Sequence, residues 1–244
     1  MRIGLFSDVH SNLAALRAVA NELQREGPLE HVVVAGDHLW GGPRPNEVWH
    51  LLNERDWTLV LGNADESLVS PTLDKDYPPG SRYRSAALRH RTWLRSLLDQ
   101  ADLDALARLP MQYRVPTPAG DLLVVHSSPR STIDRCGGPH NSPAEVEAAY
   151  SGTGATAIAF GHWHSAFVRP TPFALLLNVA SVGLPIDGRP LAAYTILTAT
   201  PAGWVVEQRR VAYDHEEERR AAHSAGLPAW VSDSVSPPDS LSPR

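Results

Sequence analysis

Three short apolar runs, separated by amphipathic stretches, most constrain how the first sixty residues can fold. The runs occupy residues 3–7, 31–35 and 57–61, and the stretches at residues 12–25 and 45–54 carry apolar side chains at helical spacing. The central run, HVVVA, is continuous rather than alternating, which is typical of a strand covered on both faces. The order strand–helix–strand–helix–strand predicts an α/β fold built in layers.

The rest of the chain is irregular at first and then rich in strands. Residues 66–110 interrupt the alternation, and we expect either a helical cap over the strand ends or a connecting helical pair. Residues 111–115 and 122–125 flank a turn, which indicates a β-hairpin. The later strands, up to residue 211, are interpreted as a meander that ends in a second sheet. Further helices are expected at residues 85–98, 102–109, 142–150 and 214–225, the first with Leu88, Leu94, Leu97 and Leu98 buried.

Length, charge and cysteine content limit the classes of protein to which this chain can belong. Residues 1–231 are expected to form a single domain, and the Ser- and Pro-rich residues 232–244 a disordered tail. The formal net charge of −5 and the lack of a basic stripe argue against binding to duplex nucleic acid. The single cysteine, Cys136, excludes an internal disulfide. The chain enters a strand at once and has no apolar run of membrane-spanning length, so we expect a cytoplasmic protein without a membrane anchor. No feature specifies an oligomeric state.

Side chains that bind divalent cations follow five of the predicted strands. They are Asp8, His10, Asp37, Asn63, His126, His162 and His164. Each alone has an ordinary explanation, such as a capping aspartate, a turn asparagine or a hydrogen-bonded histidine. Asp8 and His10 are two residues apart, so in an extended segment their side chains would point to the same side. Five strand ends that all carry such residues predict a two-metal site, and sites of that kind usually hydrolyse phosphate esters.

These motifs together resemble the calcineurin-like metallophosphoesterase superfamily. The matching pieces, in the order found in that family, are Asp8-x-His10, Gly36-Asp37, Gly62-Asn63-x-Asp65, His126 and Gly161-His162-x-His164. Two further segments resemble its small bacterial and archaeal phosphodiesterase-like branch. His126-Ser-Ser-Pro129 corresponds to HGSP, and NVASVGLP at residues 178–185 corresponds to NPGSVGxP.

The resemblance implies a four-layer α/β/β/α sandwich with two mixed β-sheets and a dinuclear metal centre. It implies that one cation is held by Asp8, His10, Asp37 and His164, and the other by Asp37, Asn63, His126 and His162. Mixed oxygen and nitrogen ligands suit Mn²⁺, Fe or Zn²⁺. The expected substrate is a small phosphoester such as a nucleotide, attacked in line at phosphorus by a hydroxide that bridges the metals. Asp37, Asn63 and His126 are the expected catalytic residues, and Asp65 is expected to support the site or cap a helix.

Position 64 departs from the family pattern. Many members have a histidine after the motif asparagine that can protonate the leaving group, whereas this chain has Ala64. The change predicts a preference for good leaving groups or diesters, or else a proton donor elsewhere, for which His38 and His90 are candidates. Asn63, His38 and Arg130 are the candidate substrate-binding residues; for the last two, an ordinary packing or surface role is the alternative.

The leading hypothesis is a metal-dependent phosphoric ester hydrolase, with phosphodiesters as the first expectation. Phosphomonoesterase, protein phosphatase and dinucleoside polyphosphate hydrolase activities stay open. A non-enzymatic protein-binding scaffold on the same fold also stays open, because the family includes a retromer subunit of that kind.

Overall fold

The first sheet is built on the N-terminal alternation of strands and helices. The computed structural model describes residues 1–227. The strands of this sheet are β1 (Arg2–Phe6), β2 (His31–Val34), β3 (Thr58–Leu59), β9 (Ala192–Thr200) and β10 (Gly203–Val211). β1, β2 and β3 are parallel, and β9 joins β1 antiparallel, so the order is β10-β9-β1-β2-β3. The sheet is therefore mixed.

The second sheet also has five strands and mixes both directions. They are β4 (Gln112–Val115), β5 (Leu122–Val125), β6 (Ala157–Phe160), β7 (Ala166–Pro170) and β8 (Leu175–Val179). The order is β4-β5-β6-β8-β7, with β5, β6 and β8 parallel and an antiparallel strand at each edge. The predicted hairpin of β4 and β5 is confirmed.

The predicted meander is wrong. β9 and β10 return to the first sheet, where Ile3 lies opposite Leu197, and they do not extend the second sheet. A strand's neighbours are set by apolar contacts between segments far apart in the chain. The run of short strands therefore predicted the strands themselves but not the sheet that β9 and β10 join.

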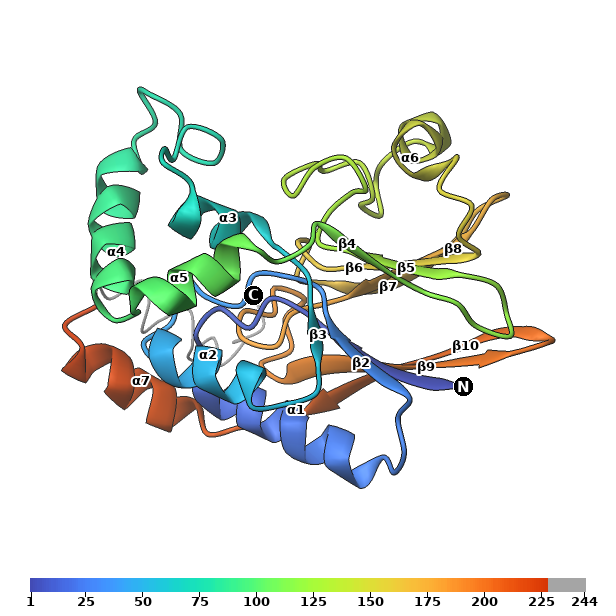
Figure 1. Cartoon of the computed structure of the whole chain (residues 1–244), viewed down its shortest axis with the longest axis horizontal. Coiled ribbons are helices and arrows are strands. Elements are labelled where there is room, and N and C mark those ends of the chain that lie inside the picture. The colour runs from blue at the N-terminus through green and yellow to red at the C-terminus, as the bar shows by residue number, and fades with distance from the viewer. Residues whose placement is uncertain (228–244) are drawn as a thin grey trace, which may run out of the picture.

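Three apolar clusters separate four layers (Figure 1). One lies between the sheets, with Leu5 and Val33 of the first facing Val124 and Ala159 of the second. Another packs the outer face of the first sheet against α1 (Leu13–Arg25) and α2 (Pro45–Asn53), and a third packs the second sheet against α6 (Pro143–Tyr150). The α/β fold class with two mixed sheets, expected from the sequence, is confirmed.

Three helices lie on the side of the molecule where β1, β2 and β3 end (Figure 1). They are α3 (Asn63–Val69), α4 (Arg84–Ser96) and α5 (Gln100–Ala107), so helices fill most of the segment for which a cap was considered. Helix α3 was not predicted from the sequence, because the glycine and asparagine at its start are common turn residues. The Asp65 carboxylate accepts a hydrogen bond from the Gly62 N–H at 3.2 Å and so helps to begin this helix.

The buried face of α4 differs from the predicted one. Leu88 and Leu97 are 43% and 40% exposed, whereas Leu94 and Leu98 are buried as expected. Ala87 and His90 complete the buried face. A histidine counts as polar in an apolar pattern, so the pattern placed the buried face incorrectly.

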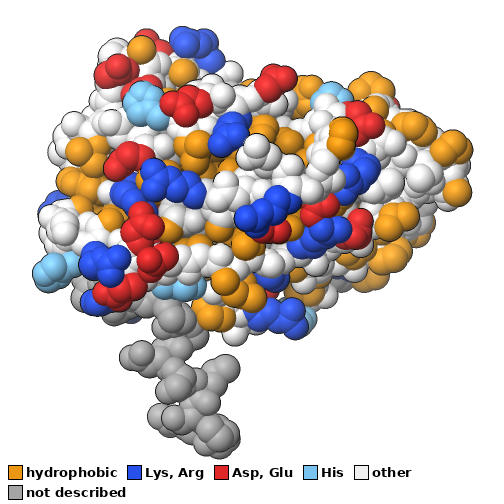
Figure 2. Space-filling view, turned by 90° about the horizontal axis from the view of Figure 1, so that it is seen from below, with side chains coloured by type: hydrophobic (Ala, Val, Ile, Leu, Met, Phe, Trp, Pro, Cys, Tyr) orange, Lys and Arg blue, Asp and Glu red, His pale blue; other side chains and the backbone are white. Residues whose placement is uncertain are grey.

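The surface seen from below carries charges of both signs. Figure 2 shows basic and acidic side chains interspersed over this face rather than gathered by sign. Several form ion pairs around α7 (His215–Ser224), such as Arg44 with Glu217 at 2.7 Å. Within residues 1–227, every helix is too short or too polar to span a bilayer. The predicted disordered tail at residues 232–244 lies outside the described residues.

Candidate metal centre

The seven ligand-type residues from five strand ends lie together at one edge of the two sheets. Asp8 and His10 follow β1, Asp37 follows β2, Asn63 follows β3, His126 follows β5, and His162 and His164 follow β6. They form a continuous network of close contacts between side-chain oxygen and nitrogen atoms. Parallel strands explain the gathering, because the carboxyl ends of such strands open onto one side of a sheet.

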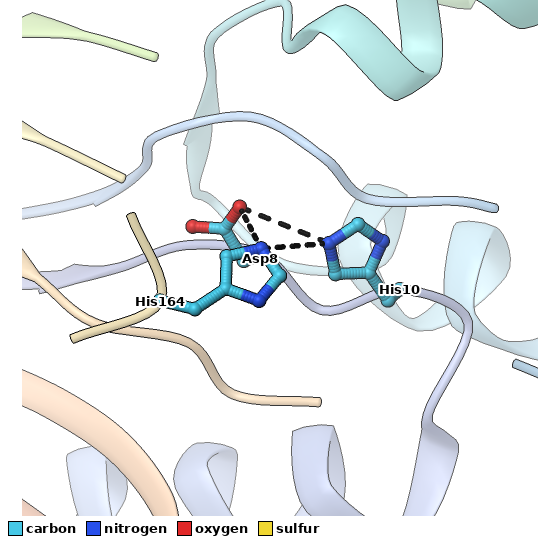
Figure 3. A group of neighbouring side chains, drawn as sticks. All are labelled: Asp8, His10 and His164. Atoms are coloured by element: carbon cyan, nitrogen blue, oxygen red, sulfur yellow. Dashed lines mark hydrogen bonds and ion pairs between the residues drawn. The ribbon is translucent and has the colours of Figure 1, made fainter. Parts of the chain in front are cut away.

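Asp8, His10 and His164 form the first group (Figure 3). Nε2 of His164 lies 3.1 Å from Oδ1 of Asp8 and 3.2 Å from Nε2 of His10. Nε2 of His10 is also 3.7 Å from Oδ2 of Asp37. Asp37 therefore connects this group to the second.

Asp37, Asn63, His126 and His162 form the second group. Oδ1 of Asn63 lies 3.0 Å from Nε2 of His126 and 3.0 Å from Nδ1 of His162. Nε2 of His126 is 3.4 Å from Oδ1 of Asp37. The two oxygens of Asp37 thus face different groups, which is the placement that a bridging carboxylate requires.

Backbone carbonyls fix the orientation of three imidazoles. Nδ1 of His10 faces the Trp40 carbonyl at 3.0 Å, Nδ1 of His126 faces that of Ala35 at 2.7 Å, and Nδ1 of His164 faces that of Leu184 at 2.7 Å. A carbonyl oxygen only accepts hydrogen bonds, so Nδ1 carries the hydrogen in each ring. In the neutral ring, Nε2 then presents a lone pair, which is how proteins orient metal-binding histidines.

The contacts inside the site bring acceptor atoms against acceptor atoms. Nε2 of His10 faces Nε2 of His164 at 3.2 Å, and both of these atoms are acceptors when the rings are neutral. The same holds for His126 against the amide oxygen of Asn63, whose Nδ2 donates to Oδ1 of Asp76 at 3.3 Å. A cation between such pairs turns repulsion into coordination. The mixture of imidazole nitrogens with carboxylate and amide oxygens therefore fits divalent transition metals.

Burial and neighbouring charges perturb the titration of the carboxylates. Burial, together with the charges of Asp8 and Asp65, raises the pKa of Asp37 well above its ordinary value. Burial alone would raise the pKa of Asp8 too, but the facing imidazole of His164 and that of His126 lower it overall. Two carboxylates this close favour one shared proton or a cation. A divalent cation beside Asp37 would reverse the upward shift.

The pKa values of two imidazoles, those of His10 and His162, are shifted in the direction that suits metal ligands. Burial, reinforced by the charge of His164, lowers the pKa of His10 to about 4. Burial and His126 lower the pKa of His162 to about 3. Burial also acts on His164, but the Asp8 carboxylate outweighs it and raises the pKa of His164. His10 and His162 are therefore neutral, and able to bind a cation, at physiological pH.

The backbone at the strand ends is strained around these residues. Asp8, His10, Asp37, His162 and His164 all have positive φ, between 50° and 66°. The expectation that Asp8 and His10 lie on an extended segment is therefore wrong, and left-handed turns aim both side chains at the site. Such conformations cost of order 1–3 kcal/mol each and cluster at functional sites.

Glycines allow the strand ends to approach the ligands. A Cβ atom on Gly62 would lie 2.1 Å from Oδ1 of Asp37, and one on Gly161 would lie 2.3 Å from Oδ2 of Asp8. Both carboxylates also accept hydrogen bonds from backbone N–H groups here. Ala64 N–H donates to Asp37 at 2.8 Å, and His162 N–H donates to Asp8 at 3.0 Å. Because these two glycines have no side chain, the backbone can lie directly against the carboxylates of Asp37 and Asp8.

Supporting residues surround the site, and the sequence predicted only some of them. Asp65 accepts hydrogen bonds from the N–H groups of His38 and Leu39 at 3.0 and 3.1 Å, so its supporting role is confirmed. The segment at residues 178–185 also acts on the site. Ser181 Oγ donates to the Asp8 carbonyl at 2.8 Å.

Asp76 and the orienting carbonyls were not predicted. Asp76 lies in the irregular stretch between α3 and α4, and a main-chain carbonyl has no signal in a sequence. Asp76 is thirteen residues beyond Asn63, so the motif itself gives no signal for it.

The three further candidate residues, His38, His90 and Arg130, differ in their exposure to solvent. Both His38 and His90 are buried. The His38 side chain has no exposed area, so the prediction that it contacts substrate or donates a proton is wrong for this structure. His90 accepts a hydrogen bond from the Gly41 N–H at 3.0 Å through Nε2, and burial lowers its pKa to about 4, so at neutral pH the ring is not the imidazolium that a general acid requires. The Arg130 side chain is 58% exposed beyond His126 and 3.9 Å from Asp134.

Comparison with known proteins identifies the family. A family model described as the calcineurin-like phosphoesterase superfamily domain matches residues 1–201. An uncharacterized protein of Methanocaldococcus jannaschii is 26% identical over an alignment that covers 94% of this chain and 95% of that protein.

Two solved structures share the fold over nearly their whole length. A metallophosphoesterase of Sphaerobacter thermophilus superposes with a TM-score of 0.76 at 25% identity, covering 97% of this chain and 99% of the other. A hypothetical protein of Pyrococcus horikoshii OT3 superposes with a TM-score of 0.81 at 16% identity, covering 96% and 97%. By its sequence and fold, the chain belongs to the calcineurin-like phosphoesterase superfamily.

Proposed function

We propose that this protein is a phosphoesterase that depends on two divalent cations and acts on phosphodiesters. Asp8, His10, Asp37 and His164 would hold one cation, and Asp37, Asn63, His126 and His162 the other. Mn²⁺, Fe and Zn²⁺ match this donor set.

One observation carries the proposal: the ligand-type atoms of seven side chains converge in two groups that Asp37 connects. When bound, two divalent cations would offset the charge of a phosphate ester and lower the pKa of water, so that hydroxide is available near neutral pH. Two aspartates remove two of about four positive charges. The loaded site would therefore remain positive and attract a phosphate ester, although the chain as a whole is acidic.

Three residues near the two groups would affect how a substrate binds and reacts. Asn63 is held by Asp76, so its amide oxygen stays directed at the second group. Ala64 supplies no proton, which favours diesters or esters with good leaving groups. Arg130, exposed next to the His126 motif, is the available cation for a non-bridging phosphate oxygen.

Metal content and hydrolysis of bis-p-nitrophenyl phosphate test the proposal. Chelation should abolish hydrolysis, and Mn²⁺ should restore it. Asp37→Asn should lower the rate at least about 100-fold, because it removes a ligand rather than a residue that merely orients one. Asp121→Asn, a change at an exposed carboxylate, should leave the rate unchanged. A folded protein that neither binds metal nor hydrolyses the ester would support a scaffold role instead.

The relative rates on different esters test the preference for diesters. We expect 2′,3′-cyclic nucleotides and bis-p-nitrophenyl phosphate to react faster than phosphomonoesters and phosphopeptides. A faster monoesterase reaction would contradict the preference without contradicting the metal-dependent chemistry.

A further inference from the structure

An apolar cavity of ≈ 550 Å³ lies between the loop after β2 and helix α4. Its lining is Trp40, Tyr77, Tyr83, Ala86, Ala87 and His90. The volume is in the range of small-molecule sites. No ligand-type residue of the metal centre lines the cavity, and nothing in the proposed chemistry uses it.

The cavity adjoins both metal groups through the backbone. The carbonyl of Trp40 accepts the hydrogen bond from Nδ1 of His10 at 3.0 Å, so the residue that lines the cavity also orients a ligand of the first group. On the other side, Tyr77 follows Asp76, which holds Asn63 of the second group. The cavity is therefore bordered by residues that orient, or directly follow a residue that orients, one ligand-type side chain in each group.

The lining presents flat aromatic surfaces. Trp40 and Tyr77 stack with ring centroids 5.9 Å apart and planes inclined by 17°. His90 meets the edge of Trp40 at 5.3 Å and stacks on Trp93 at 5.4 Å. Trp40 itself holds φ at +80°, a strained conformation for a bulky residue. The strain places an indole ring at the cavity wall beside the metal centre.

Within the described part of the chain, no Lys, Arg, Asp or Glu side chain lines the cavity. Burial lowers the pKa of His90 to about 4, so this ring is neutral at physiological pH. The guanidinium of Arg82 lies over the Tyr83 ring, 4.6 Å from its centroid. An uncharged planar group is therefore the part of a substrate that fits here.

We propose that this cavity binds the aromatic group of a phosphoester substrate, such as a nucleobase or an aryl ring, by packing it against Trp40 and Tyr77. The inference rests on the proposed function, since it requires the phosphate to lie at the metal centre. The substrates would then be phosphoesters that carry a planar aromatic group.

Binding of matched ligand pairs to the Mn²⁺-loaded protein tests this proposal without turnover. Phenylphosphonate is compared with methylphosphonate, and thymidine 5′-monophosphate with 2-deoxyribose 5-phosphate, by isothermal titration calorimetry. We expect at least one aromatic member to bind about tenfold or more tightly than its partner, as stacking on aromatic side chains gives. The first pair reports an aryl ring and the second a nucleobase.

Two variants of α4 make the test specific. Ala86→Trp fills the cavity without touching the metal ligands and should bring the affinity ratio close to one. Leu88→Trp adds the same bulk at a residue that is 43% exposed and does not line the cavity, and should leave the ratio unchanged. A ratio near one in the unmodified protein, a ratio that survives Ala86→Trp, or no binding of any of the four compounds would overturn the proposal. Aromatic preference without hydrolysis of bis-p-nitrophenyl phosphate would instead count against the proposed function alone.

Discussion

At the scale of single residues, the site is defined by orientation as much as by identity. The sequence predicted the seven ligand-type residues because each follows an apolar strand. It did not predict that Trp40, Ala35 and Leu184 direct the imidazoles, because they act through their main-chain carbonyls. His38 shows the converse: a histidine next to a ligand-type residue was a candidate for chemistry, yet it is wholly buried.

Asp76 should act as a positioning residue for Asn63. Its carboxylate accepts from the Asn63 amide at 3.3 Å and also binds Ser67. Asp76→Ala should weaken metal binding at the second group by about 10–100-fold, the range for residues that orient ligands. Asp76→Asn, which can still accept from Asn63, should retain most of the affinity. Equal losses in the two variants, measured by metal titration, would contradict the role.

Ala64 should limit the reaction with poor leaving groups. If the absent imidazole is the missing proton donor, Ala64→His should raise the rate on an ester with a poor leaving group by about 100-fold or more, the usual contribution of a general acid. The rate on bis-p-nitrophenyl phosphate should change little, because p-nitrophenolate leaves without protonation. Since Ala64 is buried, thermal unfolding must first show that the variant folds; unchanged rates on the poor ester would refute the missing-acid account.

At the scale of helices and strands, the sequence predicted where each element lies better than it predicted which other elements each one packs against. Most helices and strands lie within a few residues of their predicted ranges, because apolar spacing is a local signal. The sheet that β9 and β10 join, and the buried face of α4, depend on contacts with distant segments and were predicted incorrectly. α3 was missed because the residues at its start are also common turn residues.

Glu218 should stabilise the packing of α7 against the start of α1. It is fully buried, accepts from the Ala14 N–H at 2.6 Å, and pairs with Arg44. Glu218→Ala leaves that N–H without its partner and should lower the free energy of unfolding by about 3 kcal/mol. Glu217→Ala, at a side chain that is 38% exposed, should cost less than about 1 kcal/mol. Denaturant unfolding measures both, and similar losses would contradict the assignment.

At the scale of the whole molecule, the two sheets bring distant segments to one edge. The first sheet contributes the ligand-type residues of β1, β2 and β3, and the second contributes those of β5 and β6. Neither sheet alone carries either group of side chains, so packing of the two sheets against each other should be a condition for metal binding. The resemblance to the family implied which residues would share a cation, and the structure adds which sheet supplies each of them.

His90 should make the stability of the metal-free protein depend on pH. Its folded pKa of about 4 lies below the ordinary value of 6.5 because the ring is buried. Between these values the unfolded chain binds a proton that the folded protein does not, so stability falls as pH drops from about 6.5 to about 4. The full shift corresponds to roughly 3 kcal/mol. His90→Gln should therefore gain up to this amount relative to the original protein between pH 7 and pH 4; a constant difference in unfolding free energy would contradict the shift.

The central claim is that two cations together make the protein a phosphoesterase. The most direct test is hydrolysis of bis-p-nitrophenyl phosphate as Mn²⁺ is added stepwise to a concentrated solution of the metal-free protein. If both groups of side chains bind a cation, activity should rise until two equivalents have been added and then stay constant. A plateau at one equivalent, or no activity at any concentration of Mn²⁺, Fe²⁺ or Zn²⁺, would contradict the claim.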